Sequence, residues 1–224
     1  MRFSSQLSLK ETLAGGLGLI MLFGVIFDRS NYQSSIERLS GEPLEIIKSH
    51  VTTNIFTIIC HGYAGSSEMM RQLAFDISSS GSNVVLFDFI GHGKNKEMLV
   101  NKPQQIQGTT KQLVEQLEDV INKIHTLFGN EIKIFLVGHS MASDIVIRAS
   151  KNNDISSVVA ISPYSTAISE NFPNDLLLIS GQLETHLRAS SLDQIIKIKQ
   201  NATENETVFK ENFRRKASYI NNTG

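Results

Sequence analysis

The serine at position 140 lies in a motif typical of an activated nucleophile. Residues 138–142 are Gly-His-Ser-Met-Ala, between the apolar run Lys133–Val137 and a segment of helical spacing that begins at Met141. A sharp turn from strand to helix lifts the middle hydroxyl clear of the sheet, and small flanking residues let the neighbouring backbone approach. Ser140 is therefore a candidate nucleophile, although Ala142 occupies a position where this motif usually has glycine. The alternative is an ordinary serine that caps the following helix.

The segment His61–Ser66, with the sequence HGYAGS, directly follows the apolar run Ile55–Cys60. Its glycines allow the backbone to fold over the end of a strand, where N–H groups can point at a developing oxyanion. We expect the backbone N–H groups of Tyr63 and Met141 to form an oxyanion hole. His61 is interpreted as a structural imidazole that is hydrogen-bonded inside the turn, with a second catalytic role as the alternative.

A third polar segment, Asp88–Gly93 (DFIGHG), also comes directly after an apolar run, Asn83–Phe87. Asp88 and His92 precede Ser140 in the chain, and we interpret them as parts of a turn that fixes a loop beside the site. A metal site is not expected, because no third ligand stands at a suitable spacing from this pair.

Beyond residue 29, short apolar runs alternate with longer segments of helical spacing. This pattern is typical of an α/β fold with a mostly parallel sheet and helices on both of its faces. The predicted strands lack polar alternation, as expected when both faces are buried, and they are Ile55–Cys60, Asn83–Phe87, Lys133–Val137, Ser157–Ile161 and Asp175–Ser180. The predicted helices are Glu68–Ser79, Thr110–Phe128, Met141–Ser150 and Leu192–Gln200.

One predicted helix, Thr110–Phe128, is amphipathic. Its apolar residues recur at spacings of three and four and should face the sheet; they are Leu113, Leu117, Val120, Ile121, Ile124 and Leu127. Farther along the chain, residues 200–212 are polar and are expected to form a loop. Ala217–Ile220 is predicted to begin a last, incomplete strand.

Taken in order, the segments HGYAGS, FDFIGHG and GHSMAS resemble those of the α/β-hydrolase fold, from about residue 45 to residue 224. The resemblance is closest to bacterial membrane-associated hydrolases of the dienelactone-hydrolase or lipase-like type. It implies a serine hydrolase with a triad in the chain order serine, acid, histidine. It further implies that the acid is Glu184, in the loop after the strand Asp175–Ser180, with Asp193 as the alternative.

The base that the resemblance implies would follow the last strand of the sheet. His186 lies only two residues from Glu184 and is the alternative base. We expect a nearly complete hydrolase domain whose chain ends just before its base and which is a weak catalyst, because an unassisted serine hydroxyl is almost wholly protonated at neutral pH. A non-catalytic binding module or a decayed relative on the same fold is the second hypothesis. The histidines of the chain are His50, His61, His92, His125, His139 and His186.

Composition narrows the function classes further. The 224 residues carry a net charge of −1, one cysteine and no tryptophan. Balanced charge argues against a nucleic-acid-binding surface, which needs a face rich in Lys and Arg. The single Cys60 excludes a disulfide framework and a cysteine-based zinc cluster. We expect no cofactor.

An uncharged run covers Thr12–Phe27 near the N-terminus. As a helix it would be about 24 Å long, against about 30 Å for the hydrocarbon core of a bilayer. It is predicted to be an uncleaved, single-pass membrane anchor, with a buried helix or an apolar arm as the alternative. Arg2 and Lys10 precede the run, which favours an extracytoplasmic hydrolase domain. The predicted organisation is an N-terminal segment, 1–29, and a hydrolase domain, 30–224.

The segment between the predicted strands Ser157–Ile161 and Asp175–Ser180 is short. Lidded α/β hydrolases insert their cap at this point, so the resemblance implies that there is no cap domain and that the site is open. The implied substrate is a small-molecule or lipid-like acyl ester.

Overall fold

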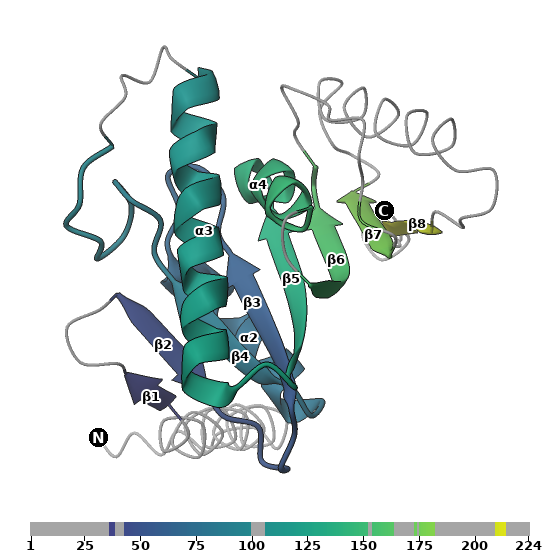
Figure 1. The fold of residues 1–224 in the computed structure, drawn as a ribbon. Helices are drawn as coiled ribbons and strands as arrows, with labels where there is room; N and C mark the ends of the chain where they lie inside the picture. The colour runs from purple at the N-terminus through teal and green to yellow at the C-terminus, as the bar shows by residue number, and fades with distance from the viewer. Residues whose placement is uncertain are drawn as a thin grey trace, which may run out of the picture. The chain divides into compact units, whose positions relative to one another are not determined.

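A sheet of eight strands forms the framework of the described part of the chain (Figure 1). The structure is a computed structural model that describes residues 36–38, 43–99, 106–151, 154–163, 173, 175–181 and 209–213, and only the backbone of 106–108 and 209–213. Nearly all of them belong to one unit, Glu37–Gly224. The strands are β1 (Ile36–Arg38), β2 (Leu44–Ile47), β3 (Ile55–Cys60), β4 (Asn83–Phe87), β5 (Lys133–His139), β6 (Ile155–Ile161), β7 (Leu176–Gly181) and β8 (Phe209–Phe213).

The strands lie in the order β1-β2-β4-β3-β5-β6-β7-β8. Strand β2 is antiparallel to β4, and every pair from β4 and β3 to β7 and β8 is parallel. Parallel neighbours need a crossover connection, which is usually a helix. The mostly parallel sheet confirms the predicted fold class.

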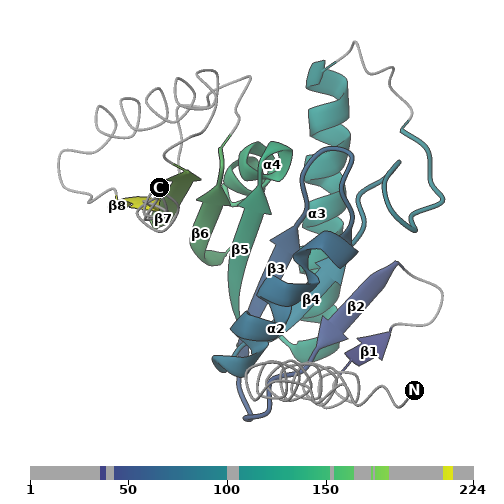
Figure 2. The ribbon, with the colours of Figure 1, turned by 180° about the vertical axis from the view of Figure 1, so that it is seen from behind.

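Helices cover both faces of this sheet, as predicted. Helices α3 (Ile106–Phe128) and α4 (Met141–Ala149) lie on the face seen in Figure 1. The short 3₁₀ helix η1 (Ser67–Met70) and helix α2 (Arg71–Ser79) lie on the opposite face, which Figure 2 shows. The single predicted helix Glu68–Ser79 is therefore two helices, because η1 ends at Met70 and α2 begins at Arg71.

The core lies on both sides of the central strands. Ile58 of β3 packs with α3 and α4, whereas the next residue, Ile59, is also fully buried and faces the other way. The alternation of side chains along a strand places neighbours on opposite faces, so a continuous apolar run is what a sheet covered on both sides requires.

The apolar face of α3 agrees with the prediction at five of its six positions: Leu113, Leu117, Val120, Ile121 and Ile124 are buried. The prediction for Leu127 is wrong, because its side chain is 47% exposed. Phe128, four residues after Ile124, is partly buried against the core instead, and its ring lies 4.6 Å from that of Phe56.

The expected loop 200–212 is wrong in its last part, where β8 begins at Phe209 and pairs with β7 in parallel. The open edge of β7 supplies the backbone hydrogen bonds that make this polar segment a strand. The predicted helix Leu192–Gln200 and the predicted strand start Ala217–Ile220 lie outside the described residues.

The predicted anchor, Thr12–Phe27, also lies outside the described residues. Within the part of the chain that the structure describes, no helix is long and apolar enough to cross a membrane.

Candidate active site

Ser140 occupies a sharp turn between β5 and α4, at the carboxyl end of a central strand. Its backbone has φ 54° and ψ −115°, a conformation that non-glycine residues adopt only when the surroundings hold them there. The Ser140 N–H donates to the Ile161 carbonyl at 2.9 Å, and the Ser143 N–H donates to the Ser140 carbonyl at 3.0 Å. These bonds fix the turn to β6 on one side and to α4 on the other.

Small residues make this turn possible. A Cβ atom on Gly138 would overlap the backbone carbonyl of Ala142 and the side chain of Val146. Ala142 itself is fully buried, so its methyl group is accommodated in the core at the position where glycine is usual. The first turn of α4 therefore lies against the backbone of β5 as closely as the atoms allow.

The loop 61–66 folds over Ser140 from the neighbouring strand β3. A Cβ atom on Gly62 would lie 3.2 Å from the Cβ of Ser140 and 3.1 Å from Nδ1 of His139. The Gly65 N–H donates to the Gly62 carbonyl at 3.1 Å and closes the turn. The structure thus brings together the two segments that the sequence analysis assigned to one site.

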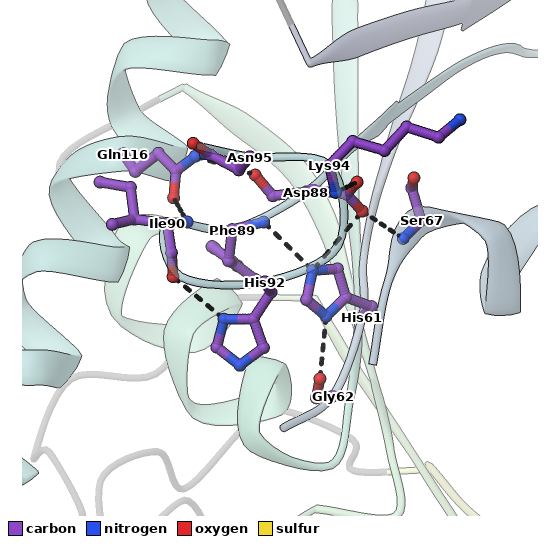
Figure 3. Close-up of polar contacts among 10 residues, drawn as sticks. All are labelled: His61, Gly62, Ser67, Asp88, Phe89, Ile90, His92, Lys94, Asn95 and Gln116. Carbon is purple, nitrogen blue, oxygen red and sulfur yellow. Dashed lines mark hydrogen bonds and ion pairs between the residues drawn. The ribbon is translucent and has the colours of Figure 1, made fainter. Parts of the chain in front are cut away.

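His61 is held inside this loop by both ring nitrogens (Figure 3). Nε2 accepts a hydrogen bond from the Phe89 N–H at 3.1 Å, so the ring proton is on Nδ1, which donates to the Gly62 carbonyl at 2.8 Å. Burial lowers the pKa of His61, and this effect outweighs the opposing one of the Gly62 bond. His61 is therefore neutral, and its structural interpretation is confirmed.

Asp88 lies beside His61 and is 2% exposed. Its carboxylate accepts the Ser67 N–H at 2.6 Å and the Lys94 N–H at 2.7 Å. Burial alone would raise the pKa of Asp88, but these N–H groups outweigh it and the pKa is lowered. Oδ1 lies 4.0 Å from Nε2 of His61, which is too far for a hydrogen bond and is no ion pair with a neutral ring.

His92 is also buried, and its Nδ1 lies 3.0 Å from the Ile90 carbonyl (Figure 3). Its ring contacts the rings of His61 and Tyr63. These contacts agree with the structural interpretation of Asp88 and His92, which stays a prediction. No group of three or more His, Cys, Asp or Glu side chains within the described ranges could hold a metal ion.

Sequence analysis missed Gln116, which comes from α3. Its Oε1 accepts the Ile90 N–H at 2.8 Å, and its Nε2 donates to the Asp88 carbonyl at 3.2 Å. Asn95 Nδ2 donates to the same Asp88 carbonyl at 3.0 Å. A glutamine on a helix about 26 residues from its partners carries no motif, and only the fold brings these groups together.

The predicted acid, Glu184, lies outside the described residues, as do its alternative Asp193 and the alternative base His186. His50 precedes β3 and His125 lies in the last turn of α3, so both are near the amino ends of the parallel strands, away from Ser140. Cys60 ends β3 but is fully buried, and burial raises the pKa of its thiol. It is therefore no alternative nucleophile.

The sheet order, the crossover helices and the turn at Ser140 are those of an α/β hydrolase, as the sequence predicted. The model of a family described as serine aminopeptidase, S33, matches residues 54–219, and the chain belongs to this family of serine hydrolases. A comparison with curated proteins gives no significant match.

Several solved structures are similar to this chain in fold. TT1662 from Thermus thermophilus has a TM-score of 0.65 at 15% identity, over 80% of this chain and 89% of that one. The esterase Pf2001 from Pyrococcus furiosus has a TM-score of 0.59 at 18% identity, over 75% of this chain and 76% of that one. XC6422 from Xanthomonas campestris, an α/β serine hydrolase without a lid, has a TM-score of 0.55 at 17% identity, over 80% of this chain and 83% of that one.

Proposed function

We propose that the protein hydrolyses carboxylic esters through an acyl-enzyme formed on Ser140. The observation that carries this proposal is the turn at Ser140, whose strained backbone lies directly under the loop 61–66. Backbone strain of about 1–3 kcal/mol persists only where the surrounding structure enforces it, and it clusters at functional sites. A serine that merely capped α4 would not need this conformation, and the side chain of Ser140 makes no cap hydrogen bond.

In the first half of the reaction, the Ser140 Oγ attacks the ester carbonyl carbon and gives its proton to an imidazole. The carbonyl oxygen becomes an oxyanion, the bond to the alcohol breaks, and the alcohol leaves with the proton from the imidazolium. Water then attacks the acyl-enzyme in the same way, releases the acid and restores the Ser140 hydroxyl.

The backbone N–H groups of Tyr63 and Met141 are proposed to bind the oxyanion. Met141 is the first residue of α4, so its N–H has no carbonyl partner one turn earlier in the helix. The Gly62 carbonyl is directed toward the His61 ring and the Gly65 N–H. In a trans peptide the Tyr63 N–H points the opposite way, so these two bonds fix its direction.

Glu184 is proposed as the acid that orients the imidazole. The imidazole is not that of His50 or His125, because both lie near the amino ends of the parallel strands, away from Ser140. His61, moreover, uses both ring nitrogens in bonds to the backbone.

The proposed substrate is a small-molecule or lipid-like acyl ester at an open site. The esterase from Pyrococcus furiosus and the lidless hydrolase from Xanthomonas campestris share the fold. The short connection between β6 and β7, from Ser162 to Asp175, leaves little chain for a cap. Family membership alone allows peptide amides as well, so the two substrate classes must be compared directly.

Residues 12–27 are proposed to attach the protein to a membrane. The test is sedimentation with lipid vesicles of the intact chain and of the variant Ile20→Arg, Leu22→Arg. Each arginine near the centre of a bilayer costs about 2.5–3.5 kcal/mol on insertion scales. The double variant should remain in the supernatant; equal sedimentation of both proteins would refute the anchor.

The test of the proposed reaction is labelling with a fluorophosphonate probe, followed by mass spectrometry of the labelled peptide. The probe should attach to Ser140, Ser140→Ala should not be labelled, and p-nitrophenyl acetate should be hydrolysed faster than an amino-acid p-nitroanilide. Absence of labelling in a folded sample contradicts the proposal. Labelling without ester turnover above the Ser140→Ala background favours the non-catalytic alternative.

A further inference from the structure

The Asp88 carboxylate joins two loops at the carboxyl edge of the sheet (Figure 3). One oxygen accepts the N–H of Ser67, at the end of the loop that covers Ser140. The other accepts the N–H of Lys94, in the loop that follows β4. Two short charge-assisted bonds, 2.6 and 2.7 Å long, therefore connect segments that are 27 residues apart in the chain.

The surroundings of Asp88 leave the carboxylate little freedom. A Cβ atom on Gly93 would overlap it, so the chain wraps closely around the charge. The Asp88 backbone carbonyl is held from two other directions by Asn95 and by Gln116 of α3. A buried carboxylate is costly unless it is fully hydrogen-bonded, and here both its oxygens have partners.

The covering loop is thereby fixed at both ends. At its start, His61 binds the Gly62 carbonyl, and the His61 ring is itself held by the Phe89 N–H. At its end, the Ser67 N–H is bound to Asp88. Phe89 and Asp88 are adjacent residues after β4, so one short segment holds the whole loop 61–67 above Ser140.

We propose that Asp88 is a positioning residue for the oxyanion hole: its carboxylate holds the loop 61–67 so that the Tyr63 N–H stays where the oxyanion forms. This inference rests on the proposed function, in which Tyr63 donates that bond. Asp88 does not contact the reacting atoms and acts only through the loop. Misplacement of a catalytic group by about 1 Å can cost about 10²-fold in rate.

The first variant is Asp88→Asn, which keeps the shape of the side chain but sets an NH₂ group against one of the two backbone N–H donors. We expect kcat for ester hydrolysis to fall about 10²-fold, as for a misplaced catalytic group, with KM close to the wild-type value. Glu45→Gln is the matched control. Glu45 is also a largely buried carboxylate with two charge-assisted bonds, but its partners are the side chains of Arg38 and Arg71.

The second variant, Ser67→Pro, removes the backbone N–H and the hydroxyl of Ser67, both of which bond to Asp88. Ser67 is the first residue of η1, and Ser66 before it is extended, with φ −153° and ψ 167°. Proline is tolerated at the first position of a helix and requires an extended residue before it. Ser67→Pro should therefore fold and lose both bonds to Asp88. Ser67→Ala loses only the bond of the hydroxyl and keeps the N–H, so it should lose less of kcat than Ser67→Pro.

Hydrogen–deuterium exchange separates this inference from the proposed function, because it needs no activity. Exchange in the peptide that covers residues 61–67 should become faster in Asp88→Asn and Ser67→Pro and stay unchanged in Glu45→Gln. If the wild-type protein is neither labelled nor active, the proposed function fails. Hydrogen–deuterium exchange then still tests whether Asp88 holds the loop 61–67. Unchanged exchange in both loop variants, or faster exchange with wild-type kcat, overturns the positioning role of Asp88.

Discussion

The two edges of the parallel sheet are built differently. At the carboxyl edge, the loops after β3 and β4 bury an aspartate and two histidines, namely Asp88, His61 and His92. At the amino edge, the buried polar groups are neutral: Asn83 accepts the Ser49 N–H and donates to the Thr53 carbonyl, and the hydroxyls of Thr57 and Ser82 lie 2.8 Å apart. Buried polar groups cost free energy unless each is satisfied, and a buried charge costs more than a neutral group, so the carboxyl edge, which buries Asp88, depends more strongly on its partners.

One glycine at each edge shows the same difference. Gly138 has no room for a Cβ atom, because the first turn of α4 lies against it. Gly129, after α3, has φ 87° and nothing within 4 Å of the place where a Cβ atom would be. The first glycine permits a close approach of two backbones, and the second permits only a turn. We therefore expect substitutions at the carboxyl edge to lower both stability and activity. Substitutions at the amino edge should lower both less.

The largest effect is expected for Gly138→Ala. Its methyl group would collide with the Ala142 carbonyl and with Val146, and overpacking of a close-packed core costs about 1–3 kcal/mol or more. We expect the free energy of unfolding, measured by urea denaturation, to fall by at least about 3 kcal/mol, and labelling of Ser140 to be lost. A loss below about 1 kcal/mol, the lower end of that range, would show that α4 is not held as tightly as the structure indicates.

The next effect should have the opposite sign. Ser140→Gly removes the strain of a positive φ, and strain of this kind is worth about 1–3 kcal/mol, partly offset by the greater freedom of glycine in the unfolded chain. We expect Ser140→Gly to be more stable than Ser140→Ala, which keeps the strain and also lacks the hydroxyl. Thermal unfolding of the two variants measures the difference. Equal stability would mean that the surroundings of Ser140 store no strain.

A smaller effect concerns pH. Because the pKa of His61 is lowered from 6.5 by burial, the unfolded chain binds a proton that the native protein does not bind in the range just below pH 6.5. The stability that His61 contributes is thus fully present above that pH and is lost as the pH falls. His61→Gln, which cannot titrate, should lose less stability than the wild type between pH 7.5 and about 5.5.

His50→Gln is the control for this pH series, since His50 is exposed. Its stability should follow that of the wild type as the pH falls. Asp88 faces the same ring, and its lowered pKa places its own loss of stability below pH 3.8, outside this window. Parallel curves for His61→Gln and the wild type would show that His61 is as easily protonated in the native protein as in the unfolded chain.

The central part of the fold was predictable from local pattern alone. Strands β3 and β4 were predicted with the observed bounds, because a continuous apolar run between polar segments indicates a strand buried on both faces. Strand β2 has only four residues, one of them Glu45, and β8 is polar, so neither carries such a pattern. Both are strands because a neighbouring strand offers its edge.

The candidate site divides in the same way. The turn at Ser140 was predicted because it needs particular side chains in a particular order. The bonds from Ser67 and Lys94 to Asp88 were not predicted, because their donors are backbone N–H groups, which every residue except proline possesses. Sequence thus identified the charged residue at the carboxyl edge but not the two loops that it joins.

The smallest effect is expected at the amino edge, for Gly129. This residue follows α3, its N–H donates to the His125 carbonyl at 2.8 Å, and its φ is positive, as in a common helix termination. Gly129→Ala fits the space but strains the backbone, at a cost of about 1 kcal/mol, whereas Gly129→Asn should cost less because asparagine tolerates this conformation. Urea denaturation of both variants measures these losses.

Neither Gly129 variant should change the rate at which the fluorophosphonate labels Ser140. The turn at Gly129 lies at the amino ends of the strands. Gly129 takes part in none of the hydrogen bonds described for Asp88 and His61. Gly62→Ala, by contrast, places a methyl group 3.2 Å from the Ser140 Cβ and should slow labelling even if it unfolds at the same urea concentration. Slower labelling in Gly129→Asn would show that the two edges are coupled through β5, and the distinction between a functional and a purely structural edge would then fail.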